Sequence, residues 1–231
     1  MTQVELSGPI APPASGKKPS QLVILCHGYG ANGQDLIGLA EPWRDFLPDA
    51  AFVAPDAPEG VPGFAGGFQW WGIGSFSEKE REKGVASAAP SLDAFIDTWL
   101  TDTELDESQL ALVGFSQGTM MALHVGLQRA KPVACIVGFS GTVAAPNLLA
   151  ESIKSRPPTL LIHGDSDEMI PPTALDEAAN FLRDQKIEVK THMSQGVGHG
   201  IGPDGVRLGA KFLVNAFALQ ASGHGKNTAT S

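Results

Sequence analysis

The sequence is poor in cysteine and in basic residues. It has two cysteines in 231 residues, and 16 lysines and arginines against 25 aspartates and glutamates. Cys26 and Cys135 lie inside apolar runs and in no metal-ligand spacing, which indicates buried, reduced thiols and no metal site. The net charge of −9 argues against a nucleic-acid partner, which needs a basic face. The charge identifies no substrate.

Long apolar runs are also missing. No stretch approaches the roughly 20 apolar residues that span a membrane, so we expect no membrane span. Residues 1–18 lack a basic start followed by an apolar core, which argues against a secretory signal and favours a cytoplasmic protein.

What is present is a globular composition, with 42% hydrophobic residues, 18% charged residues and no internal repeat. The length fits one α/β domain. We predict an N-terminal arm over residues 1–20, an α/β domain over 21–220 and a flexible C-terminal tail over 221–231.

Short apolar runs alternate with segments of helical spacing along the whole domain. The runs are typical of strands buried on both faces of a parallel sheet, and they cover residues 22–26, 51–54, 110–113, 133–138 and 159–162. A last strand is predicted over 187–191. Helices are predicted near 34–46, over 173–185 and over 203–219, and another follows Gly118. A further helix is predicted to start from an N-cap at Ser87, which places Pro90 in its first turn. The alternation predicts a mostly parallel central sheet with helices on both faces.

One strand ends in the sequence Gly114-Phe115-Ser116-Gln117-Gly118, and a helical segment follows. Glycines two residues before and after a serine permit a sharp strand-to-helix turn, which exposes the serine hydroxyl. The N–H of Gln117 falls at the helix N-terminus, where unpaired donors favour negative charge. We therefore predict that Ser116 is a nucleophile and that Gln117 contributes half of an oxyanion hole.

A serine nucleophile needs a base and an acid, and the chain supplies both in the order Ser, Asp, His. Asp167 follows the strand at 159–162, and His199 lies between glycines in a loop near the C-terminus. We predict a triad of Ser116, Asp167 and His199, with the N–H of Tyr29 as the second oxyanion donor. Asp165 is a rival acid.

The other histidines are rivals for the base. His27 and His163 end strands before a glycine, His192 follows the last strand, and His199 is favoured by its position.

A competing interpretation comes from Gly28, Gly30 and Gly33, which spell G-x-G-x-x-G directly after a strand. That pattern can bind a dinucleotide, and it makes an oxidoreductase one alternative. A hydrolase-like binding protein without activity is another. Against the first, the helix is expected to begin only near Gln34, so that the glycines lie in the loop.

Residues 59–77 form a long loop rich in glycine and aromatic residues. Loops of this length inside a compact domain are usually functional or disordered, and the aromatic content argues against disorder. We predict that Phe68, Trp70 and Trp71 from this loop, with Met169, line an apolar substrate pocket.

Taken together, these motifs resemble the phospholipase/carboxylesterase family of α/β-hydrolases, which includes bacterial carboxylesterases and acyl-protein thioesterases. The resemblance covers about residues 22–219, and it rests on the segments 25–30, 114–118, 163–167, 170–171 and 198–199. It implies an α/β-hydrolase fold without a large cap, the same triad and oxyanion positions, and no metal or cofactor. It also suggests a homodimer. Two positions depart from the family, which usually has leucine at Tyr29 and aspartate at Gly72.

The sequence thus predicts a serine carboxylesterase that acts on short- or medium-chain esters of small molecules. Thioesters and lysophospholipids are further candidate substrates.

Overall fold

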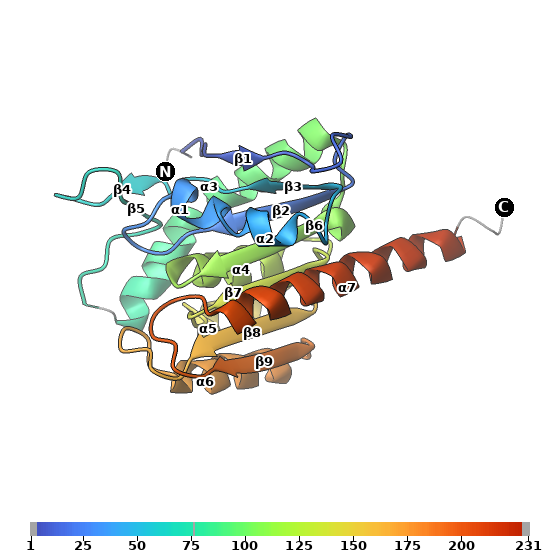
Figure 1. The fold of residues 1–231 in the computed structure, drawn as a ribbon. Coiled ribbons are helices and arrows are strands. Elements are labelled where there is room, and N and C mark those ends of the chain that lie inside the picture. The colour runs from blue at the N-terminus through green and yellow to red at the C-terminus, as the bar shows by residue number, and fades with distance from the viewer. Residues whose placement is uncertain (1–3, 76, 228–231) are drawn as a thin grey trace.

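The computed structural model describes residues 4–75 and 77–227, and its centre is a seven-stranded sheet in the order β1-β3-β2-β6-β7-β8-β9 (Figure 1). Only the pairing of β1 with β3 is antiparallel within this sheet. Its strands are β1 (Ile10–Ala11), β2 (Gln21–Cys26), β3 (Ala50–Val53), β6 (Leu110–Phe115), β7 (Cys135–Phe139), β8 (Thr159–Gly164) and β9 (Val189–Ser194). A separate hairpin pairs β4 (Glu59–Gly60) with β5 (Phe68–Gln69).

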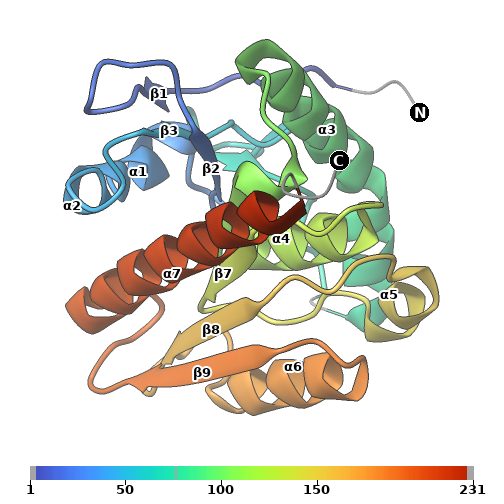
Figure 2. The same ribbon diagram turned by 90° about the vertical axis from the view of Figure 1, so that its right-hand side faces the viewer.

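Helices cover both faces of the sheet (Figure 2). One face carries α1 (Gly33–Ile37), α2 (Ala40–Trp43) and α7 (Pro203–Asn227); the other carries α3 (Glu78–Thr103), α4 (Gln117–Gln128), α5 (Pro146–Ser152) and α6 (Thr173–Asp184). Along β2, Val23 and Leu25 pack on the first face, whereas Leu22 and Ile24 pack on the second. This alternation produces two cores, and it confirms the predicted parallel sheet with helices on both faces.

The carboxyl ends of the parallel strands meet at one edge of the sheet. Cys26 at the end of β2 lies opposite Gly114 of β6, and Gly164 at the end of β8 lies opposite Ser194 of β9. The loops that follow these four strands therefore converge, although they are far apart along the chain. In open α/β sheets this edge is where ligands bind.

Several element boundaries differ from the predicted ones. The segment predicted as one helix near 34–46 forms two short helices, and Phe46, which helical spacing would place on the buried face, is 65% exposed. Helix α3 begins ten residues before the predicted start, because the side chain of Ser77 accepts a hydrogen bond from the N–H of Glu80 and caps it there. Pro90 consequently lies inside α3 and not in its first turn. Helix α7 continues to Asn227, beyond the predicted helix end at residue 219, and residues 228–231 of the predicted tail lie outside the described residues.

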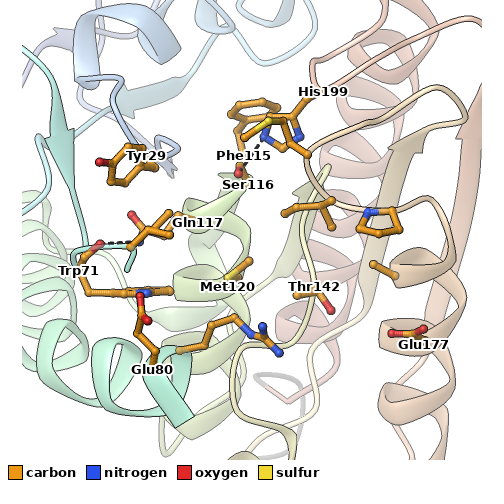
Figure 3. A pocket seen from close by; sticks show the side chains of 16 residues that line it. Tyr29, Trp71, Glu80, Phe115, Ser116, Gln117, Met120, Thr142, Glu177 and His199 are labelled. Atoms are coloured by element: carbon orange, nitrogen blue, oxygen red, sulfur yellow. Dashed lines mark hydrogen bonds between the residues drawn. The ribbon is translucent and has the colours of Figure 1, made fainter. Parts of the chain in front are cut away.

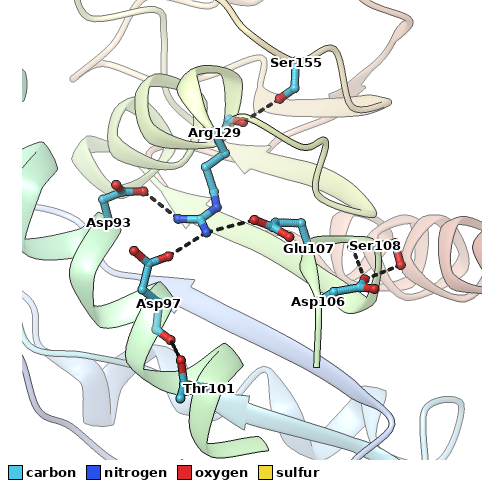
Figure 4. Close-up of polar contacts among 9 residues, drawn as sticks. Asp93, Asp97, Thr101, Asp106, Glu107, Ser108, Arg129 and Ser155 are labelled. Atoms are coloured by element: carbon cyan, nitrogen blue, oxygen red, sulfur yellow. Dashed lines mark hydrogen bonds and ion pairs between the residues drawn. The ribbon is translucent and has the colours of Figure 1, made fainter. Parts of the chain in front are cut away.

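Arg129, at the end of α4, connects three elements through a buried guanidinium (Figure 4). Its side chain is 7% exposed and lies 2.6 Å from Asp93 Oδ1, 2.7 Å from Asp97 Oδ1 and 3.3 Å from Glu107 Oε1. Asp93 and Asp97 belong to α3, whereas Glu107 belongs to a 3₁₀ turn (Glu107–Gln109) before β6. The guanidinium therefore fastens α3 and α4 to the start of the central strand.

Replacing Arg129 with methionine is expected to lower the free energy of unfolding by about 2 kcal/mol, because three charge-assisted contacts are lost and the carboxylates left behind are partly solvated. Urea denaturation measures the change. Lys18→Met is the matched control, because the Lys18–Glu104 pair is more than half exposed on both sides, so that solvent screens it and its loss should change the free energy of unfolding far less. Equal losses of unfolding free energy in the two variants would show that the buried ion pairs of Arg129 stabilise the fold no more than an exposed pair does.

Candidate active site

Ser116 occupies a strained turn between β6 and α4. Its φ of 54° and ψ of −115° lie outside the regions that residues with side chains normally adopt. A Cβ on Gly114 would overlap the carbonyl of Gly118, and a Cβ on Gly118 would overlap the carbonyl of Cys26. Both glycines are therefore required by close backbone contacts, as the spacing in the sequence predicts. The turn is held by the N–H of Ser116, which donates to the Phe139 carbonyl at 2.9 Å.

His199 bridges the serine and an aspartate. Its Nε2 lies 3.0 Å from Ser116 Oγ, and its Nδ1 lies 2.8 Å from Asp167 Oδ2. Because a carboxylate only accepts hydrogen bonds, Nδ1 carries the proton and Nε2 is left to accept the hydrogen bond of the serine hydroxyl. The ring also packs against Phe115, with the two ring centroids 5.0 Å apart. The structure thus brings the three predicted triad residues into one hydrogen-bonded chain.

The Asp167 side chain is fully buried, and its carboxylate is surrounded by two backbone N–H groups and two histidine rings. Its Oδ1 accepts hydrogen bonds from the N–H groups of Met169 and Ile170, both at 2.9 Å. Near Oδ2, His163 Nε2 lies at 3.2 Å and also donates to the Ile170 carbonyl at 3.0 Å. Burial by itself raises the pKa of Asp167, but the hydrogen bonds from His199, Ile170 and Met169 outweigh it and hold the pKa below its usual value. The carboxylate is therefore kept ionised beside His199.

The rival residues have other partners. Asp165 accepts hydrogen bonds from the Gly196 N–H at 2.8 Å and from Ser166 Oγ at 2.9 Å, which braces the loop before His199. His192 pairs with Asp204 at 2.7 Å. His27 receives a hydrogen bond from the N–H of Ala57 and contacts the carbonyl of Gly28. None of these contacts involves Ser116.

Two predicted oxyanion donors lie beside the serine. Gln117 is the first residue of α4, where backbone N–H groups have no partner within the helix. The Gly28–Tyr29 segment passes close to the turn, because a Cβ on Gly28 would lie 3.1 Å from Ser116 Cβ. Tyr29 and Gln117 both line the same cavity as Ser116.

A cavity of about 630 Å³ opens at Ser116 and His199, and most of its lining is apolar (Figure 3). Its other lining residues are Tyr29, Trp71, Ile73, Glu80, Arg81, Phe115, Gln117, Met120, Thr142, Met169, Ile170, Pro171, Ala174 and Glu177.

Of the four residues predicted to bind substrate, Trp71 and Met169 line the cavity, and Phe68 and Trp70 do not. Trp70 is 1% exposed, and its Nε1–H donates to the His27 carbonyl at 2.9 Å. Phe68 pairs through its backbone with Gly30 and Ala31, each bond being 2.8 Å long. Both residues therefore fasten the 59–77 loop to the loop that carries Tyr29. These contacts fix the position of the segment that carries Tyr29, the predicted oxyanion donor.

The 59–77 loop is anchored although Gly72 stands where the resemblance leads us to expect an aspartate. Glu80 accepts hydrogen bonds from the N–H and the hydroxyl of Ser75, both at 2.6 Å, and from the N–H of Gly74. The hydrogen bonds from Ser75 and Gly74 lower the pKa of Glu80. The Glu80 carboxylate in the first turn of α3 thus anchors the end of the 59–77 loop at Gly74 and Ser75.

Among residues 4–75 and 77–227 no group of three or more histidine, cysteine or acidic side chains is placed to hold a metal ion. In the same part of the chain, no helix has the length and apolarity that a membrane crossing requires.

The fold and the arrangement of Ser116, His199 and Asp167 are those of an α/β-hydrolase, and the described residues include no large cap over the site. Residues 12–216 match the model of the Phospholipase/Carboxylesterase family. The chain therefore belongs to that family of ester-hydrolysing enzymes.

Individual relatives agree with this placement. The chain is 30% identical over 169 residues to acyl-protein thioesterase 1 of Schizosaccharomyces pombe, an alignment that covers 69% of this chain and 74% of the relative. It is 26% identical to esterase YpfH of Escherichia coli, with 80% and 78% covered. Among solved structures, esterase PE8 superimposes with a TM-score of 0.89 at 43% identity and covers 92% of this chain and 100% of its own.

These comparisons give no support to the oxidoreductase alternative. The loop with Gly28, Gly30 and Gly33, which suggested a dinucleotide site, packs at Gly33 against other segments of this protein. A Cβ on Gly33 would overlap the Ala54 carbonyl, and the Gly33 N–H donates to Asp56 Oδ1 at 2.7 Å.

Proposed function

We propose that the protein is a serine carboxylesterase that hydrolyses short- or medium-chain esters through an acyl-enzyme intermediate. The observation that carries the proposal is the continuous chain from Ser116 Oγ through the His199 ring to Asp167 Oδ2, with links of 3.0 and 2.8 Å. Hydrogen bonds of this length are those that a nucleophile, its base and an orienting acid require.

In the proposed acylation step, Ser116 Oγ attacks the ester carbonyl while His199 Nε2 takes the hydroxyl proton. The oxyanion that forms accepts hydrogen bonds from the N–H groups of Tyr29 and Gln117, each worth roughly 3 kcal/mol in a well-studied protease. The carbon–oxygen bond to the alcohol then breaks, and His199 returns its proton to the leaving alcohol. The acyl group stays on Ser116.

Deacylation repeats these steps with water. His199 removes a proton from a water molecule, the hydroxide attacks the acyl-enzyme carbonyl, and the carboxylic acid leaves as Ser116 recovers its proton. Asp167 stabilises the imidazolium that forms in each half. Every proton that His199 takes is returned, so the cycle needs no cofactor.

The substrate class follows from the cavity and the relatives. A largely apolar cavity of about 630 Å³ has room for a short or medium acyl chain. Relatives include both esterases and acyl-protein thioesterases, and the family description includes phospholipases, so we include small thioesters and lysophospholipids among the substrates to test. The expected homodimer and cytoplasmic location stay predictions.

A fluorophosphonate probe tests the proposal directly. It is expected to label one serine per chain, and peptide mapping should place the label on Ser116. Hydrolysis of p-nitrophenyl butyrate should fall in proportion to the labelled fraction, because the same hydroxyl carries both reactions. Added NAD should leave the thermal midpoint unchanged. Full hydrolysis after stoichiometric labelling, or labelling elsewhere, would overturn the proposal, and the absence of both labelling and hydrolysis would favour the inactive binding protein.

A further inference from the structure

Trp71 is held in the wall of the cavity by contacts on two sides. Its side chain lines the cavity, yet the residue is only 6% exposed. It follows Trp70 in the segment after β5, and this segment has no regular secondary structure of its own. Its position therefore depends on what the segment and the ring contact.

The first contact comes from Gln117. The Gln117 side chain accepts a hydrogen bond from the Trp70 N–H and donates one to the Trp71 carbonyl, both at 2.9 Å. Gln117 is buried, and its carboxamide holds the main chain at both ends of the Trp70–Trp71 pair. The residue whose backbone N–H is a proposed oxyanion donor thus also holds the cavity wall through its side chain (Figure 3).

The second contact comes from Gly84 in α3. A Cβ on Gly84 would overlap the Cγ, Cδ1 and Cδ2 atoms of the Trp71 ring. Gly84 lies within a helix and has no left-handed φ, so its own backbone does not demand glycine. The absence of a side chain is explained by the ring, which lies directly on the helix backbone. Any side chain at this position would move the ring.

The proposed chemistry assigns this wall to the acyl part of the ester. His199 protonates the leaving alcohol, so the alcohol must lie on the His199 side of Ser116. Figure 3 shows His199 on one side of Ser116, and Gln117, Met120 and Trp71 on the other. An acyl chain bound to Ser116 Oγ would therefore run toward Trp71 and Met120.

We propose that Trp71, seated on Gly84 and held by Gln117, determines the length of acyl chain that the enzyme accepts. This inference rests on the proposed function. In it, Trp71 contacts the substrate, whereas Gly84 and the Gln117 side chain are positioning groups that act through Trp71.

The test measures kcat/KM for p-nitrophenyl esters with acyl chains of two to twelve carbons. Trp71→Ala removes the wall, so the ratio of kcat/KM for decanoate over butyrate should rise at least about tenfold, the size of effect that one or more methylenes produce in an apolar pocket. Gly84→Ala pushes the ring away from α3, and the same ratio should fall. In the double variant the profile should match that of Trp71→Ala, because Gly84 acts only through the ring.

Two controls separate this effect from general damage. Gly38→Ala adds the same methyl group where the nearest atom is 3.9 Å away, and its acyl profile should equal that of the wild type. A second substrate series keeps the butyryl group and varies the alcohol from methyl to octyl. The Trp71 and Gly84 variants should leave the profile of that series unchanged. If Gly84→Ala does not fold, Trp71→Ala and Trp71→Leu carry the test, with the larger rise expected in the alanine variant.

An unchanged acyl profile in Trp71→Ala would overturn the inference, as would a change confined to the alcohol series. A fall in the ratio for Gly84→Ala that persists without the Trp71 ring would also overturn it. Fluorophosphonate labelling of every variant separates these failures from failure of the proposed function. Stoichiometric labelling on Ser116 with an unchanged profile rejects only the role of Trp71, whereas hydrolysis independent of Ser116 rejects both.

Discussion

Replacing Ser116 with alanine is expected to lower kcat for ester hydrolysis by about 10⁶-fold, the loss seen when the nucleophile of a serine hydrolase is removed. Alanine cannot form the acyl-enzyme, and the alternative, direct attack by water, retains only the help of the oxyanion donors and of substrate binding. Initial rates with p-nitrophenyl butyrate measure the loss, and a fluorophosphonate probe should no longer label the chain.

The matched control is Ser155→Ala. Ser155 is also a buried serine, and its hydroxyl donates to the Gly126 carbonyl at 3.2 Å, away from the cavity. This variant is expected to lose some stability and to keep its kcat. Circular dichroism and thermal midpoints should show that Ser116→Ala remains folded. A Ser116→Ala enzyme within tenfold of the wild type would show that hydrolysis does not proceed through this hydroxyl.

The sequence predicts the serine turn well because the geometry there is local. The close contacts of Gly114 and Gly118 involve the turn itself and the adjacent strand, so glycine at both positions is a signal that a short segment carries. Asp167 and His199 are predictable for a different reason. Each follows a strand of the parallel sheet, and the carboxyl ends of such strands meet at one edge.

The lining of the cavity is less predictable from the sequence. Trp70 and Trp71 are adjacent and chemically alike, yet one ring is buried against the His27 carbonyl and the other faces the cavity. Successive residues of an extended segment point to opposite sides, so a change in register by one residue exchanges their roles. The partners that fix the register, among them Gln117 and Gly84, lie more than ten residues away.

The start of α3 illustrates the same limit. Pro90 suggests a helix that begins nearby, but tertiary contacts on both sides of it, through Val85 and Leu92, keep the helix continuous across the missing hydrogen bond. Because the sequence does not predict the first turns of α3, it also does not predict that Glu80 and Arg81 line the cavity. The signal that could have located this start is Ser77, a good N-cap residue three positions before an acid.

Replacing Asp167 with asparagine is expected to lower kcat/KM by about 10⁴-fold while leaving the fold intact. The asparagine amide can donate to His199 Nδ1, which favours the tautomer with the proton on Nε2. That nitrogen then cannot accept the proton of Ser116, so the serine is no longer activated. The rate of fluorophosphonate labelling should fall in parallel, because it depends on the same proton transfer.

Asp165→Asn is the matched control for this substitution, since Asp165 lies two residues away and its carboxylate serves the loop at Gly196 and Ser166. An asparagine there keeps one oxygen to accept these hydrogen bonds, so kcat/KM should stay within about tenfold of the wild type. The two carboxylates thus have distinct tasks, one toward the imidazole and one toward the backbone that carries it. The reverse result, with the large loss in Asp165→Asn and little in Asp167→Asn, would move the acid of the triad to Asp165 and would require the His199 loop to rearrange in solution.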